Sequence, residues 1–190
     1  MFKDRRQAGK LLADKLALYA TANPVVYALP RGGLPVAEEV ARRLKAPLDL
    51  ILVRKLGAPG HEELAMGAIV DGGAPTTILH QDIVSELAVP DRYIEETKTA
   101  ALREIERRRQ LYMKDSPAIS PEGRTAIIVD DGLATGATME AAVAAMRKAK
   151  AGRIIVAIPV APEDAVRNLL KTADDVAVLT TPYPFLSVGS

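Results

Sequence analysis

The chain has 190 residues, of which 48% are hydrophobic and 26% are charged, and its formal net charge is +1. This composition is typical of one globular domain, and the near-zero charge gives no electrostatic reason to expect binding to nucleic acid. The absence of cysteine excludes disulfides and thiol chemistry, and the two histidines lack the spacing of a helical metal pair. The sequence shows no apolar signal segment and no apolar run long enough to span a bilayer, so we expect a cytoplasmic protein.

The first 55 residues predict two helices and two strands. Apolar spacing favours an amphipathic helix over residues 4–20, and Asp4 is placed to cap it. The segments that follow are a strand at Pro24–Leu29, the turn Pro30–Gly33, a helix at Leu34–Leu44 and a strand at Leu48–Lys55. A strand–helix–strand unit of this length pairs its two strands in parallel.

The next part of the chain predicts a loop and a hairpin. The segment Leu56–Leu64 is polar and contains glycine and proline, which indicates a mobile loop. Two short strands, at about 65–71 and 76–80, flank a Gly-Gly turn. They predict a hairpin extension at the edge of the sheet.

The longest helical pattern covers residues 91–113, with Asp91 as its predicted cap. It contains the basic run Arg107–Arg109, which could bind phosphate or RNA. Pairing with Glu104 and Glu106 on a solvent-exposed face is the interpretation that the spacing favours. The sequence leaves the oligomeric state open, and an exposed helix of this length is compatible with a homodimer.

A second α/β series follows the loop that ends at Gly123. Its predicted elements are a strand at 124–130, a helix at Ala137–Ala149, a strand at 153–160, a helix at Pro162–Lys171 and a strand at 175–182. The alternation predicts a single three-layer α/β/α domain over residues 1–190, with a mostly parallel sheet and an antiparallel edge strand. Residues 71–123 form a predicted cap insertion.

Two loops of this predicted fold should meet. If the first strands and the strands after residue 123 extend the sheet in opposite directions, the strand at Pro24–Leu29 lies next to the strand at 124–130. Ligands of such sheets bind at the carboxyl ends of the strands where the order reverses. The turn Pro30–Gly33 and the segment Asp130–Thr138 would then face one crevice.

The segment IIVDDGLATGAT, at residues 127–138, combines two kinds of binding group. Asp130 and Asp131 end a buried strand, where paired carboxylates are costly unless they accept hydrogen bonds from hydroxyls or lie near a hard cation. The small residues after them let backbone amides close around an anion at the start of a helix. The residues concerned are Gly132, Leu133, Ala134, Thr135, Gly136, Ala137 and Thr138. An acidic strand end before a capped helix is the alternative, purely structural interpretation.

This segment resembles the signature of the type I phosphoribosyltransferases: four apolar residues, two acids, three small or apolar residues and Thr-Gly-x-Thr. The resemblance implies the family fold and the substrate 5-phosphoribosyl 1-pyrophosphate (PRPP), bound with Mg²⁺. It implies that Asp130 and Asp131 hold the ribose hydroxyls and that Ala134–Thr138 wrap the 5-phosphate. The phosphoribosyl group would go to a nitrogenous acceptor, such as a nucleobase, with release of pyrophosphate. The wider similarity is to uncharacterised bacterial phosphoribosyltransferase-like proteins with LPRGG and VRKLGAPGHEELAMGAI, here Leu29–Gly33 and Val53–Ile69.

Basic residues near the predicted crevice are candidates for pyrophosphate binding. The turn Pro30, Arg31, Gly32 and Gly33 occupies the position of the family's pyrophosphate loop, and an arginine fork suits phosphate oxygens. Arg54 and Lys55 end the second predicted strand, and salt bridges are their structural alternative. We expect Arg31 and Lys55 to join the two aspartates in catalysis.

The segment Gly57–Leu64 resembles the family's lid, which would exclude water from the reacting sugar. His61, Glu62 or Glu63 could then transfer a proton, although ordinary surface positions are the simpler interpretation.

Two features bear on the acceptor. An alanine at position 134 is similar to the pattern of the family's adenine- and orotate-type enzymes. Family members that act on 6-oxopurines typically carry an aspartate at this position. Tyr183 or Phe185 could stack on a planar base, and core packing is the alternative. The sequence does not identify the acceptor. The resemblance also implies that related chains continue beyond the position of Ser190, where part of the base site would lie.

Two other functions fit the sequence less well. A regulator that senses PRPP or a nucleotide on the same fold, with or without RNA, is supported only by Arg107–Arg109 and the long helix. A dinucleotide-binding fold would need G-x-G-x-x-G after the first strand, but the turn there reads Pro-Arg-Gly-Gly.

Overall fold

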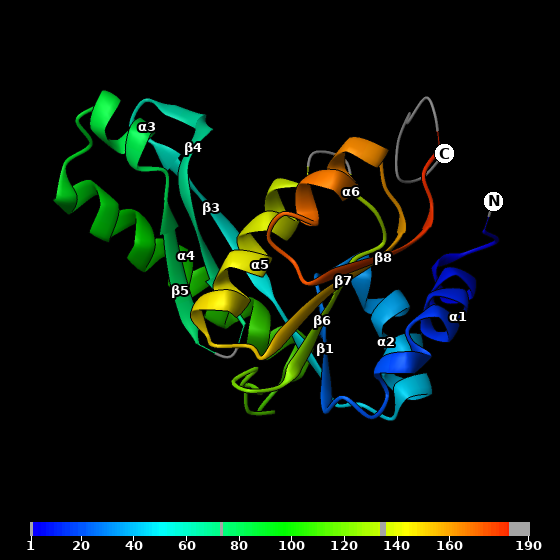
Figure 1. Cartoon of the computed structure of the whole chain (residues 1–190). Helices are drawn as coiled ribbons and strands as arrows, with labels where there is room; N and C mark the ends of the chain where they lie inside the picture. The colour runs from blue at the N-terminus through cyan, green and yellow to red at the C-terminus, as the bar shows by residue number, and fades with distance from the viewer. Residues whose placement is uncertain (1, 73, 134–135, 183–190) are drawn as a thin grey trace.

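A five-stranded parallel sheet forms the centre of the computed structural model, which describes residues 2–72, 74–133 and 136–182 (Figure 1). The strand order is β2-β1-β6-β7-β8. The strands are β1 (Pro24–Ala28), β2 (Leu48–Leu50), β6 (Thr125–Val129), β7 (Arg153–Val160) and β8 (Asp175–Thr180). Every residue of β1 and β6 is buried, as expected for apolar, β-branched strands covered on both faces.

Helices cover both faces of this sheet, which confirms the predicted three-layer α/β/α fold. The helices α1 (Arg5–Lys15) and α2 (Gly33–Leu44) pack on one face, and α5 (Ala137–Lys148) and α6 (Glu163–Leu169) pack on the other. Asp4 caps α1 as predicted, because its carboxylate accepts a 2.7 Å hydrogen bond from the backbone N–H of Gln7. A 3-10 turn, η1 (Ala17–Tyr19), continues the predicted first helix.

The chain order of the strands reverses between β1 and β6. These two strands pair in parallel, with Ala28 opposite Val129. From β1 the chain moves outward to β2, and from β6 it moves outward to β7 and β8. The predicted neighbours are therefore confirmed, and the loops after Ala28 and Val129 leave the sheet side by side.

The predicted strand Leu48–Lys55 is two strands rather than one. β2 ends at Leu50, where the backbone N–H of Ile51 donates to the carbonyl of Ala28, the last residue of β1. β3 (Leu52–Ala58) then joins a separate antiparallel sheet with the order β3-β4-β5. The segment Leu48–Lys55 reads as one strand and gives no sign of this change of partner. The antiparallel strands form their own sheet and not the predicted edge of the parallel one.

The prediction of a mobile loop at Leu56–Leu64 is also wrong. β4 (His61–Asp71) pairs with β3, and Ala58 lies opposite His61 across a two-residue turn. The first four residues of β4, His61–Leu64, are exposed. They therefore lack the apolar alternation that identifies a strand in the sequence. The predicted hairpin that follows is confirmed, because β5 (Pro75–Leu79) pairs antiparallel with β4.

Two helices complete this part of the chain. α3 (Gln81–Glu86) was not predicted, and α4 (Asp91–Met113) has its predicted length. Asp91 is not the cap of α4: Pro90 occupies that position without a side-chain hydrogen bond, and Asp91 is the first helical residue. β5, α3 and α4 lie within the predicted insertion at residues 71–123, but the antiparallel sheet already begins at Leu52.

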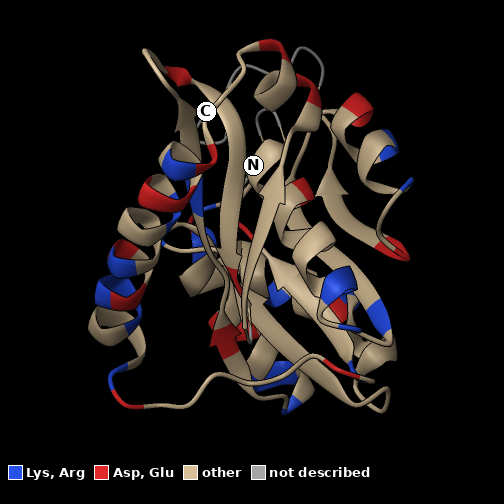
Figure 2. Cartoon of the chain, turned by 90° about the vertical axis from the view of Figure 1, so that its left-hand side faces the viewer, with Lys and Arg blue, Asp and Glu red and all other residues tan. Residues whose placement is uncertain are grey.

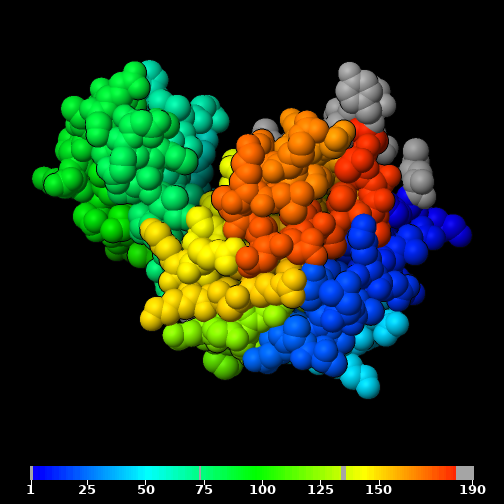
Figure 3. All heavy atoms as spheres, viewed as in Figure 1, coloured from blue at the N-terminus to red at the C-terminus, as the bar shows by residue number. Residues whose placement is uncertain are grey.

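The antiparallel sheet lies between α4 and α5. The face toward α4 has its own core, which includes Leu56, Ile69 and Ile105, whereas Val70 belongs to the core around α5. The space-filling view shows the surface hollowed between this part of the molecule and the α5–α6 side of the parallel sheet (Figure 3). No helix in the described ranges is long and apolar enough to cross a membrane.

The outer side of α4 alternates in charge along the helix (Figure 2). Arg107 and Arg108 each form an ion pair of 2.8 Å with Glu104, which confirms the ion-paired interpretation for these two residues. Glu106 accepts from Gln110 instead. Arg109 differs from its neighbours, because it points to the core and is buried.

Candidate functional site

The turn after β1 and the acid pair after β6 are in contact. The backbone N–H of Leu29 donates to the carbonyl of Val129 at 2.9 Å, which holds the two loop starts together. A Cβ atom on Gly32 would overlap the carboxylate of Asp131, and one on Gly33 would lie 2.6 Å from the carbonyl oxygen of Val129. Only glycine at these positions permits so close an approach. The structure thus brings the two predicted binding segments to one place.

Asp130 and Asp131 differ in their surroundings. Asp131 forms an ion pair with Arg5 at 2.8 Å, and its side chain is 18% exposed. The carboxylate of Asp130 accepts the backbone N–H of Asp131 at 2.8 Å and forms no ion pair with any described residue. Burial, together with the negative charge of Asp131, raises the pKa of Asp130 to about 7, although the Asp131 N–H and Arg5 act to lower it. At neutral pH this carboxyl can therefore act as a hydrogen-bond acceptor or as a donor.

The segment after the acid pair leads into α5. Gly132, Leu133 and Gly136 are buried, and Gly136 has a φ of +83°, which favours glycine. Ala137 and Thr138 are exposed in the first turn of α5, where backbone N–H groups have no partner within the helix. The start of α5 is therefore suited to an anion. Ala134 and Thr135, the other predicted phosphate contacts, lie outside the described residues.

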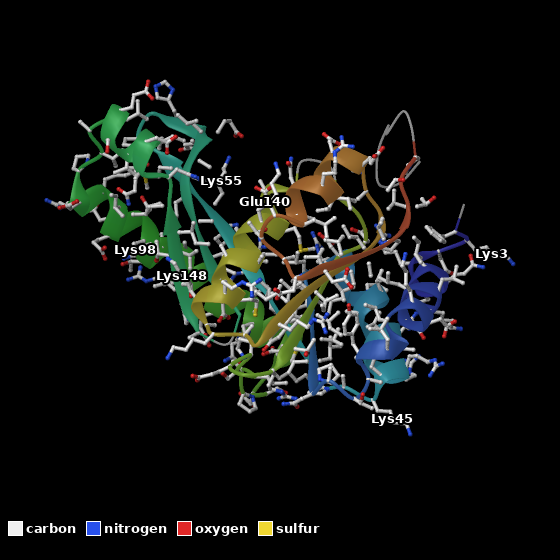
Figure 4. All side chains as sticks on the ribbon, in the orientation of Figure 1. Lys3, Lys45, Lys55, Lys98, Glu140 and Lys148 are labelled. Atoms are coloured by element: carbon white, nitrogen blue, oxygen red, sulfur yellow. The ribbon has the colours of Figure 1, made fainter. Side chains whose placement is uncertain are left out.

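Of the predicted basic residues, Arg31 and Lys55 lie toward this site. Arg54 does not, because it shares the face of β3 with Leu52 and Leu56, which pack toward α4. Arg31 is exposed on the turn, next to a cis peptide bond with Pro30. Lys55 is 48% exposed and lies 3.3 Å from Glu63 of the neighbouring strand. Figure 4 shows Lys55 extending from β3 toward the gap that Glu140 of α5 also faces. Among the described residues, no ion pair links Arg31, Arg54 or Lys55 to either aspartate.

The remaining predicted residues are less informative. His61, Glu62 and Glu63 are exposed beside the turn of the β3–β4 hairpin. The predicted base-stacking residues Tyr183 and Phe185 lie outside the described residues.

Sequence reasoning missed two charged residues. The sequence analysis did not single out Arg5, yet Arg5 pairs with Asp131. Arg109 donates to Asp71 at 2.6 Å and to Asp49 at 2.9 Å in the core. Its position is visible in the sequence as a helical spacing, because Arg109 follows the buried Ala101 and Ile105 at intervals of one turn.

Comparisons with known proteins agree with this geometry. The family model described as "Phosphoribosyl transferase domain" matches residues 3–185. A Mycobacterium tuberculosis (strain H37Rv) protein named "Putative phosphoribosyl transferase" is 42% identical over 189 residues. That alignment covers 100% of this chain but 42% of the relative, so the chain spans less than half the length of the curated relatives it matches.

Two solved structures place the fold. The crystal structure of TT1426 from Thermus thermophilus is 42% identical, with a TM-score of 0.83, and the match covers 100% of this chain and 88% of that one. A hypoxanthine-guanine phosphoribosyltransferase from Bacillus anthracis has a TM-score of 0.52 at 14% identity, with coverage of 95% and 80%, and shares the fold. Since the family model covers nearly the whole chain and the acid pair meets the glycine turn as the resemblance implies, this chain belongs to the phosphoribosyl transferase domain family.

Proposed function

We propose that this chain is a phosphoribosyltransferase that moves the 5-phosphoribosyl group of PRPP to a nitrogen atom of a small acceptor. The observation that carries the proposal is the contact between Gly32 and the carboxylate of Asp131, because it joins two binding segments from distant parts of the sequence. The family match over residues 3–185 supports the same activity. The acceptor is a nucleobase or a related nitrogenous compound.

In this proposal each end of PRPP has its own set of groups. The carboxylates of Asp130 and Asp131 accept hydrogen bonds from the ribose hydroxyls. The backbone N–H groups of Ala134–Thr138 bind the 5-phosphate, which is supported by the exposed first turn of α5. The backbone of Pro30–Gly33, with the side chain of Arg31, binds the pyrophosphate, and Lys55 approaches it from β3. Arg54 is not part of this set, because its side chain lies on the opposite face of β3, with Leu52 and Leu56.

The residues also fit a magnesium ion that arrives with PRPP. Mg²⁺ prefers oxygen ligands and keeps several waters, so one or two carboxylates near the phosphates suffice. Asp130 and Asp131 supply such oxygens, and the raised pKa of Asp130 shows a carboxyl whose ionised form would gain from a nearby cation. The ion would neutralise part of the negative charge of the phosphates.

The transfer breaks one bond at C1 of the ribose and forms another. The C1–O bond to pyrophosphate breaks and its electron pair leaves with the pyrophosphate, the acceptor nitrogen bonds to C1, and the acceptor loses a proton. The protein orients the two reactants and stabilises charge on the leaving group. Arg31 and Lys55 serve the leaving pyrophosphate, and the β3–β4 hairpin would limit the access of water.

Calorimetry with PRPP and MgCl₂ tests the binding site. The double variant Asp130→Asn/Asp131→Asn should lose PRPP binding, because amides cannot replace two carboxylates toward hydroxyls and a cation. Glu95→Gln/Glu96→Gln removes the same charge from exposed, adjacent acids of α4 and should bind like the wild type. Wild-type affinity in the aspartate variant would refute the assignment.

A screen of nucleobases and small amines with PRPP and Mg²⁺ then tests the reaction, with released pyrophosphate as the readout. Pyrophosphate release that depends on one acceptor would identify the substrate. Tight PRPP binding with no release for any acceptor would favour the alternative, a regulator that senses PRPP.

A further inference from the structure

Arg5 lies at the candidate site although it belongs to the first helix of the chain. Its Nε donates a hydrogen bond of 2.8 Å to Oδ2 of Asp131. The side chain of Arg5 is 59% exposed, whereas that of Asp131 is 18% exposed. A guanidinium has five N–H donors, and this contact uses one of them. Among the described residues, no other hydrogen bond from the Arg5 side chain is present, so its outer donors face the solvent beside Asp131.

The start of α1 is held firmly in this position. Asp4 caps the helix, which places Arg5 in its first turn. Gly9 lets α1 sit directly on α2, because a Cβ there would lie 2.9 Å from the carbonyl oxygen of Val36. Arg6 adds ion pairs to two acids of α2. The placement of Arg5 at Asp131 therefore follows from the packing of two helices.

The helix on which α1 packs also begins at the glycine turn. α2 starts at Gly33, and the preceding residue, Gly32, touches the carboxylate of Asp131. Arg5 and the turn thus meet Asp131 from elements packed on one face of the sheet, whereas the anion-binding start of α5 lies on the opposite face. A cation in this position is on the pyrophosphate side of the proposed site.

Stability alone does not account for the contact. A solvent-exposed ion pair contributes little to folding, and this one occupies a carboxylate that ribose hydroxyls need. A guanidinium fork matches two phosphate oxygens, which gives Arg5 an alternative partner once Asp131 binds the sugar.

We propose that Arg5 is a further substrate-binding residue: it neutralises Asp131 in the free protein and binds the pyrophosphate group of PRPP in the complex. This inference rests on the proposed function. It adds a contact from the N-terminal helix to those of the turn Pro30–Gly33.

Calorimetry with three ligands in MgCl₂ tests the inference: PRPP, inorganic pyrophosphate and ribose 5-phosphate. In Arg5→Ala the Kd for PRPP and for pyrophosphate should rise about tenfold or more, as expected for the loss of a charge-assisted contact. The Kd for ribose 5-phosphate, which lacks the pyrophosphate, should change less than about threefold. Arg5→Lys keeps the charge without the fork and should recover only part of the affinity.

Arg43→Ala is the matched control. Arg43 is also 59% exposed and also forms one ion pair, at 3.2 Å with Asp14 of α1, but this pair lies between α1 and α2 and does not involve the acid pair. It should lower thermal stability to a similar extent as Arg5→Ala while leaving all three affinities unchanged. Equal PRPP affinity in Arg5→Ala and Arg43→Ala would overturn the proposed role of Arg5 but not the proposed function of the chain. Tighter PRPP binding in Arg5→Ala would also overturn it and would show a competing, inhibitory contact. A wild type that fails to bind PRPP would overturn both the role of Arg5 and the proposed function.

Discussion

Arg109 of α4 and Asp49 of β2 form a buried ion pair, with 2.9 Å between Nη1 and Oδ1. The same guanidinium donates to Asp71 of β4 at 2.6 Å. Burial acts to lower the pKa of Arg109, but its hydrogen bonds to Asp71 and Asp49 outweigh burial and raise it. The second oxygen of Asp49 accepts the backbone N–H of Ile119 at 2.7 Å. One side chain therefore joins α4, the parallel sheet and the antiparallel sheet.

Replacing Arg109 by alanine should destabilise the protein strongly. The change leaves Asp49 and Asp71 buried without their cation, and breaking such a pair costs about 3–5 kcal/mol. Urea unfolding measures the loss. Arg107→Ala is the control, because Arg107 pairs with Glu104 on the exposed side of the same helix and should change stability little. Similar losses in the two variants would show that the buried network does not hold the sheets together.

Gly32→Ala should weaken PRPP binding without unfolding the protein. The added methyl group would overlap the carboxylate of Asp131, so the turn or the aspartate must move. We expect at least about a tenfold increase in the Kd for PRPP, measured by calorimetry, because both are proposed ligand contacts. Gly123→Asn is the control. Gly123 has a φ of +69°, which asparagine tolerates, and has open space around it. It precedes the amino-terminal end of β6, whereas the candidate site lies at the carboxyl end of that strand. Unchanged PRPP affinity in Gly32→Ala would argue against the assignment of the turn.

The titration of Asp130 should make the protein less stable as the pH rises. Burial and the charge of Asp131 raise its pKa from 3.8 to about 7, so between these values the folded protein holds a proton that the unfolded chain has released. Stability from this group is then full below about pH 4 and declines as the pH rises to about 7. Each pKa unit corresponds to about 1.4 kcal/mol, so the decline amounts to a few kcal/mol.

Asp130→Asn cannot titrate and should remove this decline. The variant should be more stable than the wild type at pH 8, and the difference should shrink as the pH falls toward 4. Thermal unfolding over this pH range measures it. A difference that does not change with pH would contradict the raised pKa. A gain in stability on loss of a binding residue is typical of functional sites.

Lys55→Ala should slow the proposed transfer more than it weakens PRPP binding. Lys55 is half exposed and, within the part of the chain that the structure describes, bonds only to Glu63, at 3.3 Å or more. It extends toward the gap beside α5, from which it could reach a leaving pyrophosphate (Figure 4). Loss of one charge-assisted contact should reduce kcat about 10- to 100-fold. Single-turnover assays of pyrophosphate release give the rate, and calorimetry gives the affinity. Lys98→Ala, on α4, should change neither, since Lys98 pairs with Glu95 in a surface contact. A rate close to that of the wild type would remove Lys55 from the reaction.

Much of the fold was predictable because it depends on local patterns. The strands β1, β6 and β7 are continuous apolar runs, and the helices α2 and α5 have apolar spacing with clear starts. Alternation of these elements implies a parallel sheet. The adjacency of β1 and β6 was expected on the condition that the two halves of the chain extend this sheet in opposite directions, which they do. The second sheet was not predictable in the same way, because Leu48–Lys55 reads as one strand although its pairing partner changes at Ile51.

The candidate site shows the same division. The acids Asp130 and Asp131 and the glycine turn are recognisable because the chemistry of one short segment is complete in the sequence. Their contact required two strands to be neighbours, which the topology implied. The basic residues were harder to interpret: of Arg107, Arg108 and Arg109 the first two are surface charges and the third is a core residue, and only the helical face distinguishes them.

The sequence by itself determined the helices and strands around the parallel sheet, their α/β order and the binding segment at the end of β6, since hydrophobic periodicity and a contiguous motif need no distant partner. Only the tertiary structure decided which charges meet: Arg5 with Asp131, and Arg109 with Asp49 and Asp71. The physical reason is that an ion pair depends on the distance between two side chains after packing. For residues far apart in the chain, that distance is set by how helices and sheets stack and not by any local pattern.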